Sequence, residues 1–127
     1  MRKVILALLL VVGISFAYEN LDSKSFYKMI QQEKNIIILD VRTPEEYAKD
    51  GHIPNSILIP VQVLPQYIKD LEKFKDKKIL VYCRSGSRSS VASKFLEQNG
   101  FKNVYNLKYG IIDWKKEGLP VEYGVKK

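Results

Sequence analysis

The sequence predicts an α/β fold in which about five strands form a mostly parallel sheet with helices on both faces. Three observations predict this class. Short apolar runs rich in β-branched residues, such as residues 36–39, are typical of strands buried on both faces. Segments with apolar residues at intervals of three and four separate these runs along the chain. A length of 127 residues, 46% of them hydrophobic and 28% charged, suits one globular domain.

The predicted strands share a short apolar core that turn-forming residues bound on both sides. They are residues 36–39, 57–59, 78–82 and 104–107, with a further strand near 18–21. Because these strands alternate with helices, their carboxyl ends should meet at one edge of the sheet, where ligands collect in such folds. Asp40 and Arg42 follow one strand at this edge, and Cys83 follows another.

Each predicted helix begins at a capping residue or where the apolar periodicity starts. The expected starts are Asp22 or Ser23, Thr43, Leu64, a position between Ser87 and Ser90, and Ile111. The expected ends are Asn35, Asp50, Phe74, Asn99 and Gly118. The second start is the best defined, because Thr43 can cap the helix, Pro44 suits its first position and Glu46 can close a capping box.

The first seventeen residues have the three-part pattern of a secretory signal. Met1 to Lys3 is basic, residues 4–16 are almost wholly apolar, and Ser15 and Ala17 place small residues at a cleavage site. The apolar run is shorter than the roughly 20 residues that a spanning helix needs. We therefore predict a signal peptide over residues 1–17, a mature domain over residues 18–127, and a periplasmic or secreted protein. An uncleaved membrane anchor is the alternative.

Charge and cysteine content narrow the function. The formal net charge of +7 favours anionic substrates or partners, but the sequence has no basic and aromatic stripe that would indicate nucleic-acid binding. Cys83 is the only cysteine, so it cannot form a disulfide within the chain. In an oxidising compartment, an unpaired cysteine is either a reactive thiol or a buried apolar filler.

The stretch VYCRSGSRSS, residues 81–90, favours the reactive thiol. It joins a predicted strand to a predicted helix, and the first N–H groups of a helix have no partners within it. If the loop curls, the N–H groups of residues 84–88 form an anion-binding nest, and Arg84 and Arg88 add positive charge. Both effects favour a nucleophilic thiolate at Cys83. The remaining candidates for binding are Ser85, Gly86, Ser87 and Ser89.

Four segments of the chain resemble signatures of the single-domain rhodaneses, the thiosulfate sulfurtransferases. They are the loop Cys83–Ser89, the segment from Leu39 to Tyr47, the segment from Gly51 to Pro60, and the segment from Gly110 to Val121. They occur in the order in which that family has them and span nearly all of residues 18–127. Two departures are the single Gly110, where the family often has two glycines, and Asn55-Ser56, where it usually has Gly-Ala.

The resemblance implies a five-stranded parallel sheet and a cysteine that carries sulfane sulfur as a persulfide. Cys83 would take the outer sulfur of a small anionic donor such as thiosulfate and pass it to cyanide or a thiol, with ping-pong kinetics. Arg84 and Arg88 would hold the donor. Asp40 and Arg42 would support the loop as a buried ion pair, and His52 would be structural. The resemblance implies no metal or cofactor.

Other functions remain open at this point. Phosphatases and arsenate reductases of a similar fold have a loop one residue longer, whereas four residues separate Cys83 from Arg88 here. The shorter loop suits one sulfur atom better than a phosphate. An exported persulfide carrier with a protein donor or acceptor needs the same loop, so the sequence does not separate it from a thiosulfate enzyme. A binding module with an idle Cys83 is a further alternative. We expect no nucleic acid as a partner and no membrane contact after signal cleavage.

Overall fold

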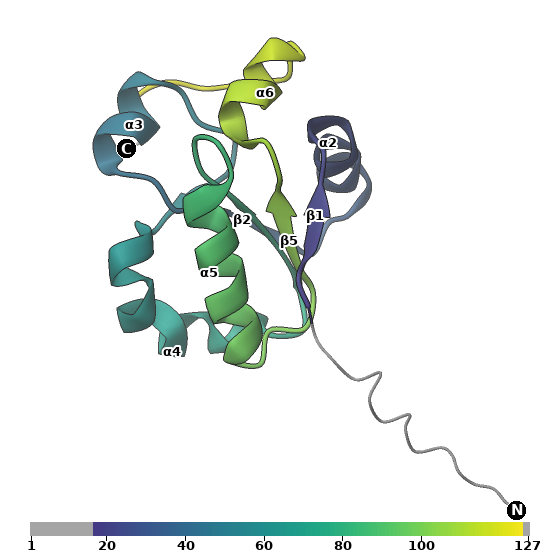
Figure 1. The fold of residues 1–127 in the computed structure, drawn as a ribbon, viewed down its shortest axis with the longest axis vertical. Helices are drawn as coiled ribbons and strands as arrows, with labels where there is room; N and C mark the ends of the chain where they lie inside the picture. Colours follow the sequence, from purple (N-terminus) through teal and green to yellow (C-terminus); the bar gives the residue numbers. More distant parts are fainter. Residues whose placement is uncertain (1–16, 126–127) are drawn as a thin grey trace, which may run out of the picture.

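The computed structural model describes residues 17–125 and confirms the predicted α/β class (Figure 1). Five strands form one sheet in the order β1-β5-β4-β2-β3, and every neighbouring pair is parallel. The strands are β1 (Glu19–Leu21), β2 (Ile36–Asp40), β3 (Ile57–Leu58), β4 (Lys78–Tyr82) and β5 (Val104–Leu107). The strand predicted near residues 18–21 is therefore real and pairs with β5 at the sheet edge.

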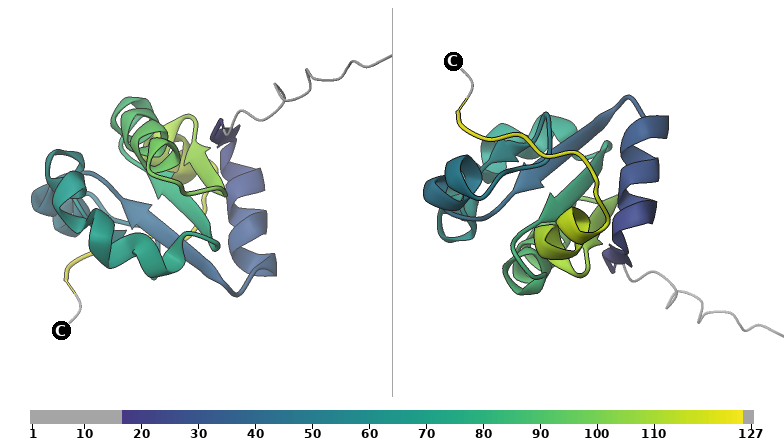
Figure 2. Two further views of the ribbon diagram at one scale, coloured as in Figure 1. Left: turned by 90° about the horizontal axis from the view of Figure 1, so that it is seen from below. Right: turned by 90° about the horizontal axis from the view of Figure 1, so that it is seen from above.

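Helices cover both faces of this sheet, as predicted (Figure 2). The α-helices are α2 (Ser23–Gln32), α3 (Pro44–Lys49), α4 (Ile68–Leu71), α5 (Ser87–Gln98) and α6 (Gly110–Lys116). One core lies between the sheet and α5 with the segment around α4, and includes Leu64, Leu71 and Leu96. The other lies between the sheet and helices α2 and α6, and includes Phe26 and Trp114. Both cores are apolar, which explains why the central strands alternate little between apolar and polar residues.

Side-chain caps define the starts of helices α2 and α3. Asp22 caps α2, since its carboxylate accepts the N–H of Ser25 at 2.8 Å. Helix α3 has the predicted capping box, in which Thr43 accepts the N–H of Glu46 and the Glu46 carboxylate accepts the N–H of Thr43. The latter helix contributes no buried side chain, so its cap and its position beside the β4–α5 loop matter more than its packing.

The prediction of one amphipathic helix from Leu64 to Phe74 was wrong in its helix type. This segment consists of the 3₁₀ helix η2 (Val61–Tyr67), the short α4 and the 3₁₀ helix η3 (Glu72–Phe74). Pro65 lies inside η2 and has no N–H to donate to a continuous α-helix. The apolar spacing was still informative, because Leu64 and Leu71 are buried in the core.

Three predicted boundaries also need correction. Helix α2 ends at Gln32, with Glu33 as its cap, rather than at Asn35. Strand β2 continues to Asp40, and β3 ends at Leu58 rather than Ile59. The predicted signal peptide lies almost wholly outside the described residues. Within residues 17–125, no helix has the length and apolar character needed to cross a membrane.

Candidate active site

The loop between β4 and α5 lies at the carboxyl edge of the sheet, where the sequence placed it (Figure 1). Cys83 is the first residue of this loop, and its side chain is 1% exposed and part of the core. Gly86 and Ser89 are buried, whereas Arg84, Ser85 and Ser87 are exposed. The loop therefore encloses the sulfur and turns its polar side chains outward.

Two backbone N–H groups converge on the Cys83 sulfur. The N–H of Gly86 lies 3.1 Å from Sγ, and the N–H of Ser89 lies 3.3 Å from it. The second donor is one position beyond the predicted range of residues 84–88. Both come from the start of α5, where N–H groups have no partners in the helix. A sulfur that accepts two N–H groups is in a site that stabilises negative charge.

Gly86 makes this curl possible. Its φ angle is +108°, a left-handed conformation that side chains rarely adopt. A Cβ at this position would lie 2.1 Å from the backbone oxygen of Lys108. The Ser89 hydroxyl donates to the Gly86 carbonyl at 3.2 Å and holds the end of the curl. The loop conformation thus depends on contact with the segment that follows β5.

The start of α6 supports the loop from the other side. The N–H groups of Ile111 and Ile112 donate to the carbonyls of Cys83 and Arg84 at 3.0 and 3.2 Å. Gly110 has a φ of +73°, and a Cβ there would lie 2.0 Å from the Arg84 carbonyl oxygen. Sequence reasoning gave α6 no part in the site. The only indication in the sequence was Gly110, which directly precedes the apolar residues Ile111 and Ile112.

Arg88 has a partner that the sequence did not indicate. Its two terminal nitrogens each donate to a different Glu46 oxygen at 2.8 Å, so the two charges form a bidentate pair between α5 and α3. Arg88 lowers the pKa of Glu46 to about 2, against the opposing effect of burial. Arg88 therefore fixes the loop end against α3, and two of its five N–H donors are used by Glu46. Glu46 had been assigned only a capping role.

Asp40 and Arg42 form a buried ion pair at the end of β2. The Arg42 side chain donates to Asp40 at 2.8 to 3.2 Å and to the Gly51 carbonyl at 2.7 Å. Their side chains are 0% and 1% exposed, respectively. Burial, the largest single effect, lowers the pKa of Arg42, but the hydrogen bonds to Asp40 and the nearby negative charge of Asp40 together outweigh it, so that the Arg42 pKa is raised.

Tyr82 is a further buried side chain beside the pair of Asp40 and Arg42. Its hydroxyl accepts the N–H of Ile53 at 3.0 Å and lies 3.1 Å from the Ser56 hydroxyl. Burial, followed by the charge of Asp40, raises the pKa of Tyr82 well above its usual value. The Arg42 guanidinium lies 5.5 Å from the centre of the same ring. Because Cys83 directly follows Tyr82, these contacts hold the end of β4 from which the loop starts.

His52 is held by contacts of its own. Its ring stacks on Tyr47 at 3.7 Å, its Nδ1 lies 2.8 Å from the Tyr47 carbonyl, and its Nε2 lies 3.8 Å from Glu122. An antiparallel bridge also joins His52 to Glu122. These contacts fasten the carboxyl-terminal segment to α3 and agree with a structural role.

A hollow of about 230 Å³ lies beside the loop and is called the basic hollow here. Its walls come from the end of β2, the end of α3, the loop and α6. They consist of Arg42, Asp50, Arg84, Ile111, Ile112 and Lys115. Among residues 17–125, no three His, Cys, Asp or Glu side chains lie close enough to hold a metal ion.

The parallel sheet, with a single cysteine held by loop N–H groups at its carboxyl edge, defines the class of α/β proteins that hold a cysteine between a strand and a helix. Comparison with known proteins identifies the family: residues 22–117 match the rhodanese-like domain, and the chain belongs to that family. A sulfurtransferase of Allochromatium vinosum is 37% identical over 101 residues, which cover 80% of this chain and 92% of that protein.

Two further relatives show how widely the domain is used. The crystal structure of a rhodanese-related protein from Thermoplasma volcanium is 39% identical, with a TM-score of 0.72 over 83% of this chain and 98% of that one. A tRNA uridine(34) hydroxylase of Buchnera aphidicola is 40% identical over 101 residues. The match covers 73% of this chain but only 32% of the hydroxylase, so only a part of that protein is comparable.

Proposed function

We propose that this protein is a sulfurtransferase that moves sulfane sulfur from a donor such as thiosulfate to a thiophilic acceptor through a persulfide on Cys83. The observation that carries this proposal is the convergence of the Gly86 and Ser89 N–H groups on the Cys83 sulfur. These donors can stabilise the Cys83 thiolate when it attacks the donor, and again when it leaves in the transfer to the acceptor. The similarity to a relative named sulfurtransferase supports the same reaction class.

The reaction consists of two displacements on sulfur. The Cys83 thiolate attacks the outer sulfur of thiosulfate, and the sulfur–sulfur bond of the donor breaks with its electron pair leaving on sulfite. The acceptor thiolate or cyanide then attacks the outer sulfur of the Cys83 persulfide, and that electron pair returns to Cys83. Neither step needs an oxidant, a metal or a cofactor, and the order implies ping-pong kinetics.

The arginines of the loop have different roles in this proposal. Arg84 is exposed, lines the basic hollow and is placed to attract an anionic donor. Arg88 acts through its pair with Glu46, which holds the start of α5 and so the Ser89 N–H. The same pairing disfavours a phosphatase or arsenate reductase, since such an enzyme needs a free guanidinium to hold a tetrahedral anion.

We further propose that the protein works outside the cytoplasm after cleavage behind Ala17. The support is the basic, apolar and small-residue pattern of residues 1–17. There, the buried position of Cys83 protects a thiol that has no disulfide partner in the chain. Amino-terminal sequencing of exported protein tests the boundary, and a start other than Tyr18 would contradict it.

Mass spectrometry of the intact protein tests the reaction. Treatment with thiosulfate should add the mass of one sulfur atom, and cyanide should remove it. Cys83→Ser should remain unmodified, and Ser85→Ala, which changes an exposed loop position, should still be loaded. Failure of the wild-type protein to gain sulfur from thiosulfate and from other sulfane donors would refute the proposal. Loading by a protein persulfide but not by thiosulfate would identify a carrier, and Cys83-dependent hydrolysis of an aryl phosphate would favour the phosphatase class.

A further inference from the structure

The last residues that the structure describes are fastened over the turn that follows α3. Residues 121–125 are called the carboxyl-terminal strap here, and they cross from the side of α6 to α3 (Figure 1). The backbones of His52 and Glu122 exchange two hydrogen bonds of 2.8 Å. The N–H of Gly124 donates to the Ala48 carbonyl at 2.9 Å. Most of the strap is exposed, so these bonds hold it more than close packing does.

The contacts of the His52 ring fix which of its nitrogens carries a hydrogen in the neutral form. Its Nδ1 lies 2.8 Å from the Tyr47 carbonyl, which can only accept, so Nδ1 is the donor. The neutral ring then presents a lone pair at Nε2, which lies 3.8 Å from the Glu122 carboxylate. Two acceptors face each other there and form no hydrogen bond. A second proton on the ring turns Nε2 into a donor and makes the contact an ion pair.

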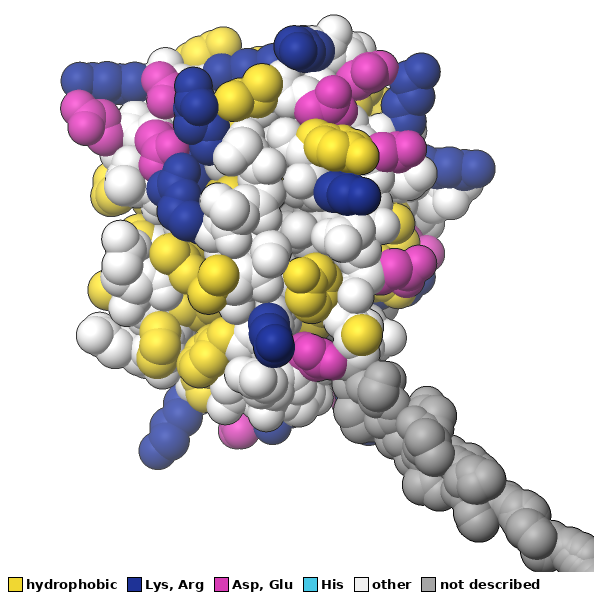
Figure 3. Space-filling model, viewed as in Figure 1, with side chains coloured by type: hydrophobic (Ala, Val, Ile, Leu, Met, Phe, Trp, Pro, Cys, Tyr) yellow, Lys and Arg dark blue, Asp and Glu magenta, His cyan; other side chains and the backbone are white. Residues whose placement is uncertain are grey.

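Two elements bring titratable groups to the His52 ring. On α3, Tyr47 stacks on it with ring centres 3.7 Å apart, and on the strap Glu122 and Tyr123 line a hollow of about 390 Å³ beside it. Phenols ordinarily stay neutral and carboxylates ionised between about pH 5 and 8, whereas histidine changes charge there. His52 is the only histidine of the chain. Charges of both signs are mixed over the end of the molecule that carries α3 and α6, so the effect of this pair is local (Figure 3).

The strap covers a residue that supports the candidate site. The Tyr123 ring lies against Gly51, since a Cβ on Gly51 would be 3.0 Å from that ring. The Gly51 carbonyl accepts a hydrogen bond from the Arg42 side chain at 2.7 Å, and Arg42 is paired with Asp40. Because His52 directly follows Gly51, the contact that holds the strap lies next to the residue that the strap covers. Opening of the strap therefore removes cover from a partner of the buried ion pair.

We propose that His52 and Glu122 form a pH-sensitive latch for the carboxyl-terminal strap. In acid, protonated His52 pairs with the Glu122 carboxylate and holds the strap closed over Gly51. As pH rises, His52 loses its proton and the ion pair is lost. Only the backbone hydrogen bonds then hold the strap, and it opens more often. The stabilisation is thus present at low pH and disappears as pH rises, and it does not depend on the proposed transfer of sulfur.

Hydrogen exchange of single amides, followed by NMR, tests the latch. The exchange rates of the Glu122 and Gly124 amides are measured at about pH 5.5 and 7.5, on either side of the usual titration of histidine, and divided by the intrinsic rate at each pH. We expect protection of both amides to be about two- to fivefold greater at the lower pH, the range that a partly exposed ion pair supplies. The Gly100 amide, which donates to the Glu97 carbonyl at the end of α5, opens without breaking the latch and should show no such change.

Three variants assign the pH dependence to this pair. Glu122→Gln removes the carboxylate but keeps the backbone bonds, and the position is exposed, so the fold should be retained. In this variant the protection of the Gly124 amide should no longer depend on pH. His52→Gln should give the same result, and Glu122→Gln decides the question alone if that variant does not fold. Glu117→Gln is the matched control, because Glu117 is also exposed but pairs with Lys24, and it should keep the wild-type pH dependence.

Several results would overturn the latch. Protection of the strap amides that is equal at the two pH values, or greater at the higher one, would refute it. A pH dependence that persists in Glu122→Gln, or that disappears equally in Glu117→Gln, would show that the Glu122 carboxylate is not the partner of His52. Sulfur loading of Cys83 enters none of these outcomes, so this inference and the proposed function can fail separately.

Discussion

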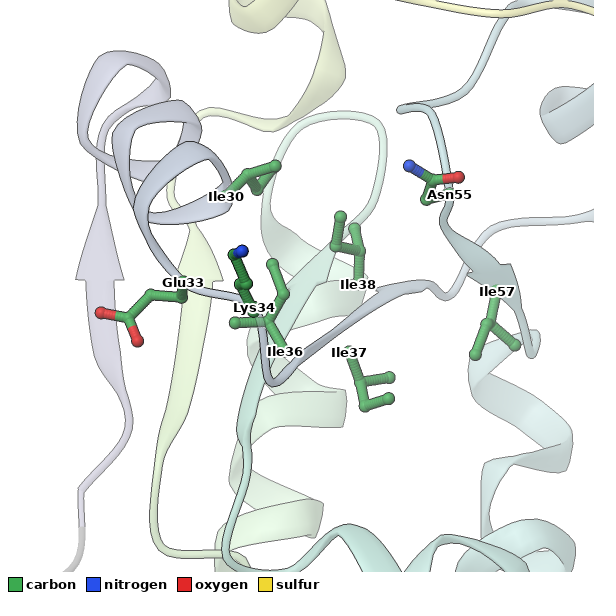
Figure 4. A pocket seen from close by; sticks show the side chains of 8 residues that line it. All are labelled: Ile30, Glu33, Lys34, Ile36, Ile37, Ile38, Asn55 and Ile57. Atoms are coloured by element: carbon green, nitrogen blue, oxygen red, sulfur yellow. The ribbon is translucent and has the colours of Figure 1, made fainter.

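Two hollows of similar size lie at opposite ends of the strands and differ in chemistry. The basic hollow, of about 230 Å³, lies at the carboxyl ends of the strands. The other, of about 270 Å³, lies at the amino end of β2 and is lined by five isoleucines with Glu33, Lys34 and Asn55. Figure 4 shows Ile36 and Ile38 on one side of β2 and Ile37 on the other, as expected for neighbouring residues of a strand. We call this second cavity the isoleucine hollow.

The comparison shows that volume does not identify a site in this fold. At the carboxyl edge, N–H groups at the start of helix α5 meet the Cys83 sulfur, two glycines shape the loop, and a buried ion pair lies at the end of β2. At the amino edge, α2 ends and the chain enters a strand, so N–H donors do not converge there in the same way. Because the strands are parallel, the candidate site lies at the carboxyl edge of the sheet, and the amino edge contributes to packing.

The largest difference between the two edges should appear when an ion pair is broken. Asp40→Asn leaves the Arg42 charge buried without its counter-ion, and we expect the free energy of unfolding to fall by about 3–5 kcal/mol. Glu33→Gln breaks the Glu33–Lys78 pair beside the isoleucine hollow, where the side chains are 40% and 32% exposed. That change should be nearly neutral. Urea denaturation of both variants makes the comparison, and equal losses would contradict it.

Glycine substitutions should have the next largest effect. Gly86→Ala and Gly110→Ala each place a Cβ about 2 Å from a backbone oxygen, so the loop must move. We expect a loss of about 2–4 kcal/mol and reduced sulfur loading of Cys83. Gly118→Ala is the matched control, because its φ is +73° but nothing lies within 4 Å of the added Cβ. It should cost about 1 kcal/mol and leave loading intact. Comparable losses at all three positions would show that close contact is unimportant.

The Glu46–Arg88 pair should have a smaller effect that depends on pH. The pKa of Glu46 is about 2 in the folded protein and 4.5 as its reference value, so the folded state favours the ionised carboxyl. The stabilisation is complete above pH 4.5 and is lost as pH falls towards 2. Glu46→Gln keeps the capping box but should lower the free energy of unfolding by about 1–2 kcal/mol at neutral pH. The difference between the two proteins should shrink below pH 4.5 and vanish only below about pH 2, and a constant difference would refute this origin.

The smallest effect is expected at the isoleucine hollow. Ile57 lines it and is 44% exposed, so Ile57→Thr removes little buried surface and keeps a β-branched residue on the edge strand. The free energy of unfolding should change by less than about 0.5 kcal/mol, and sulfur loading of Cys83 should not change. A loss of loading in this variant would mean that the two edges are coupled, and would break the contrast between them.

Much of the fold could be predicted because its signals are local. The apolar runs of β2, β4 and β5, the capping box at Thr43 and the glycines that end helices each act within a few residues. The position of Cys83 at the carboxyl edge followed from a strand before it and a helix after it. The segment from Leu64 to Phe74 was less predictable, since its spacing is helical while Pro65 forces a tighter turn.

The site itself was predicted only in part. The sequence indicated Cys83, the converging N–H groups and the supporting residues Asp40 and Arg42. It did not indicate that Arg88 pairs with Glu46, 42 positions earlier in the chain, nor that Gly110 packs on the Arg84 carbonyl. The pairing of distant groups depends on how the chain folds back on itself, and no local pattern encodes the distance between them.

By itself, the sequence determined which groups can react and where the sheet would present them. A lone cysteine between a strand and a helix, with Gly86 three residues later and arginines nearby, already predicts a nucleophile in an anion-stabilising loop. Only the tertiary structure decided how Arg88 is paired, because the fold brings Arg88 on α5 to Glu46 on α3, whereas the pair of Arg42 and Asp40 was already expected from the sequence. It left Arg84 and Lys115 to face the hollow beside the loop, since their elements meet only in the folded chain.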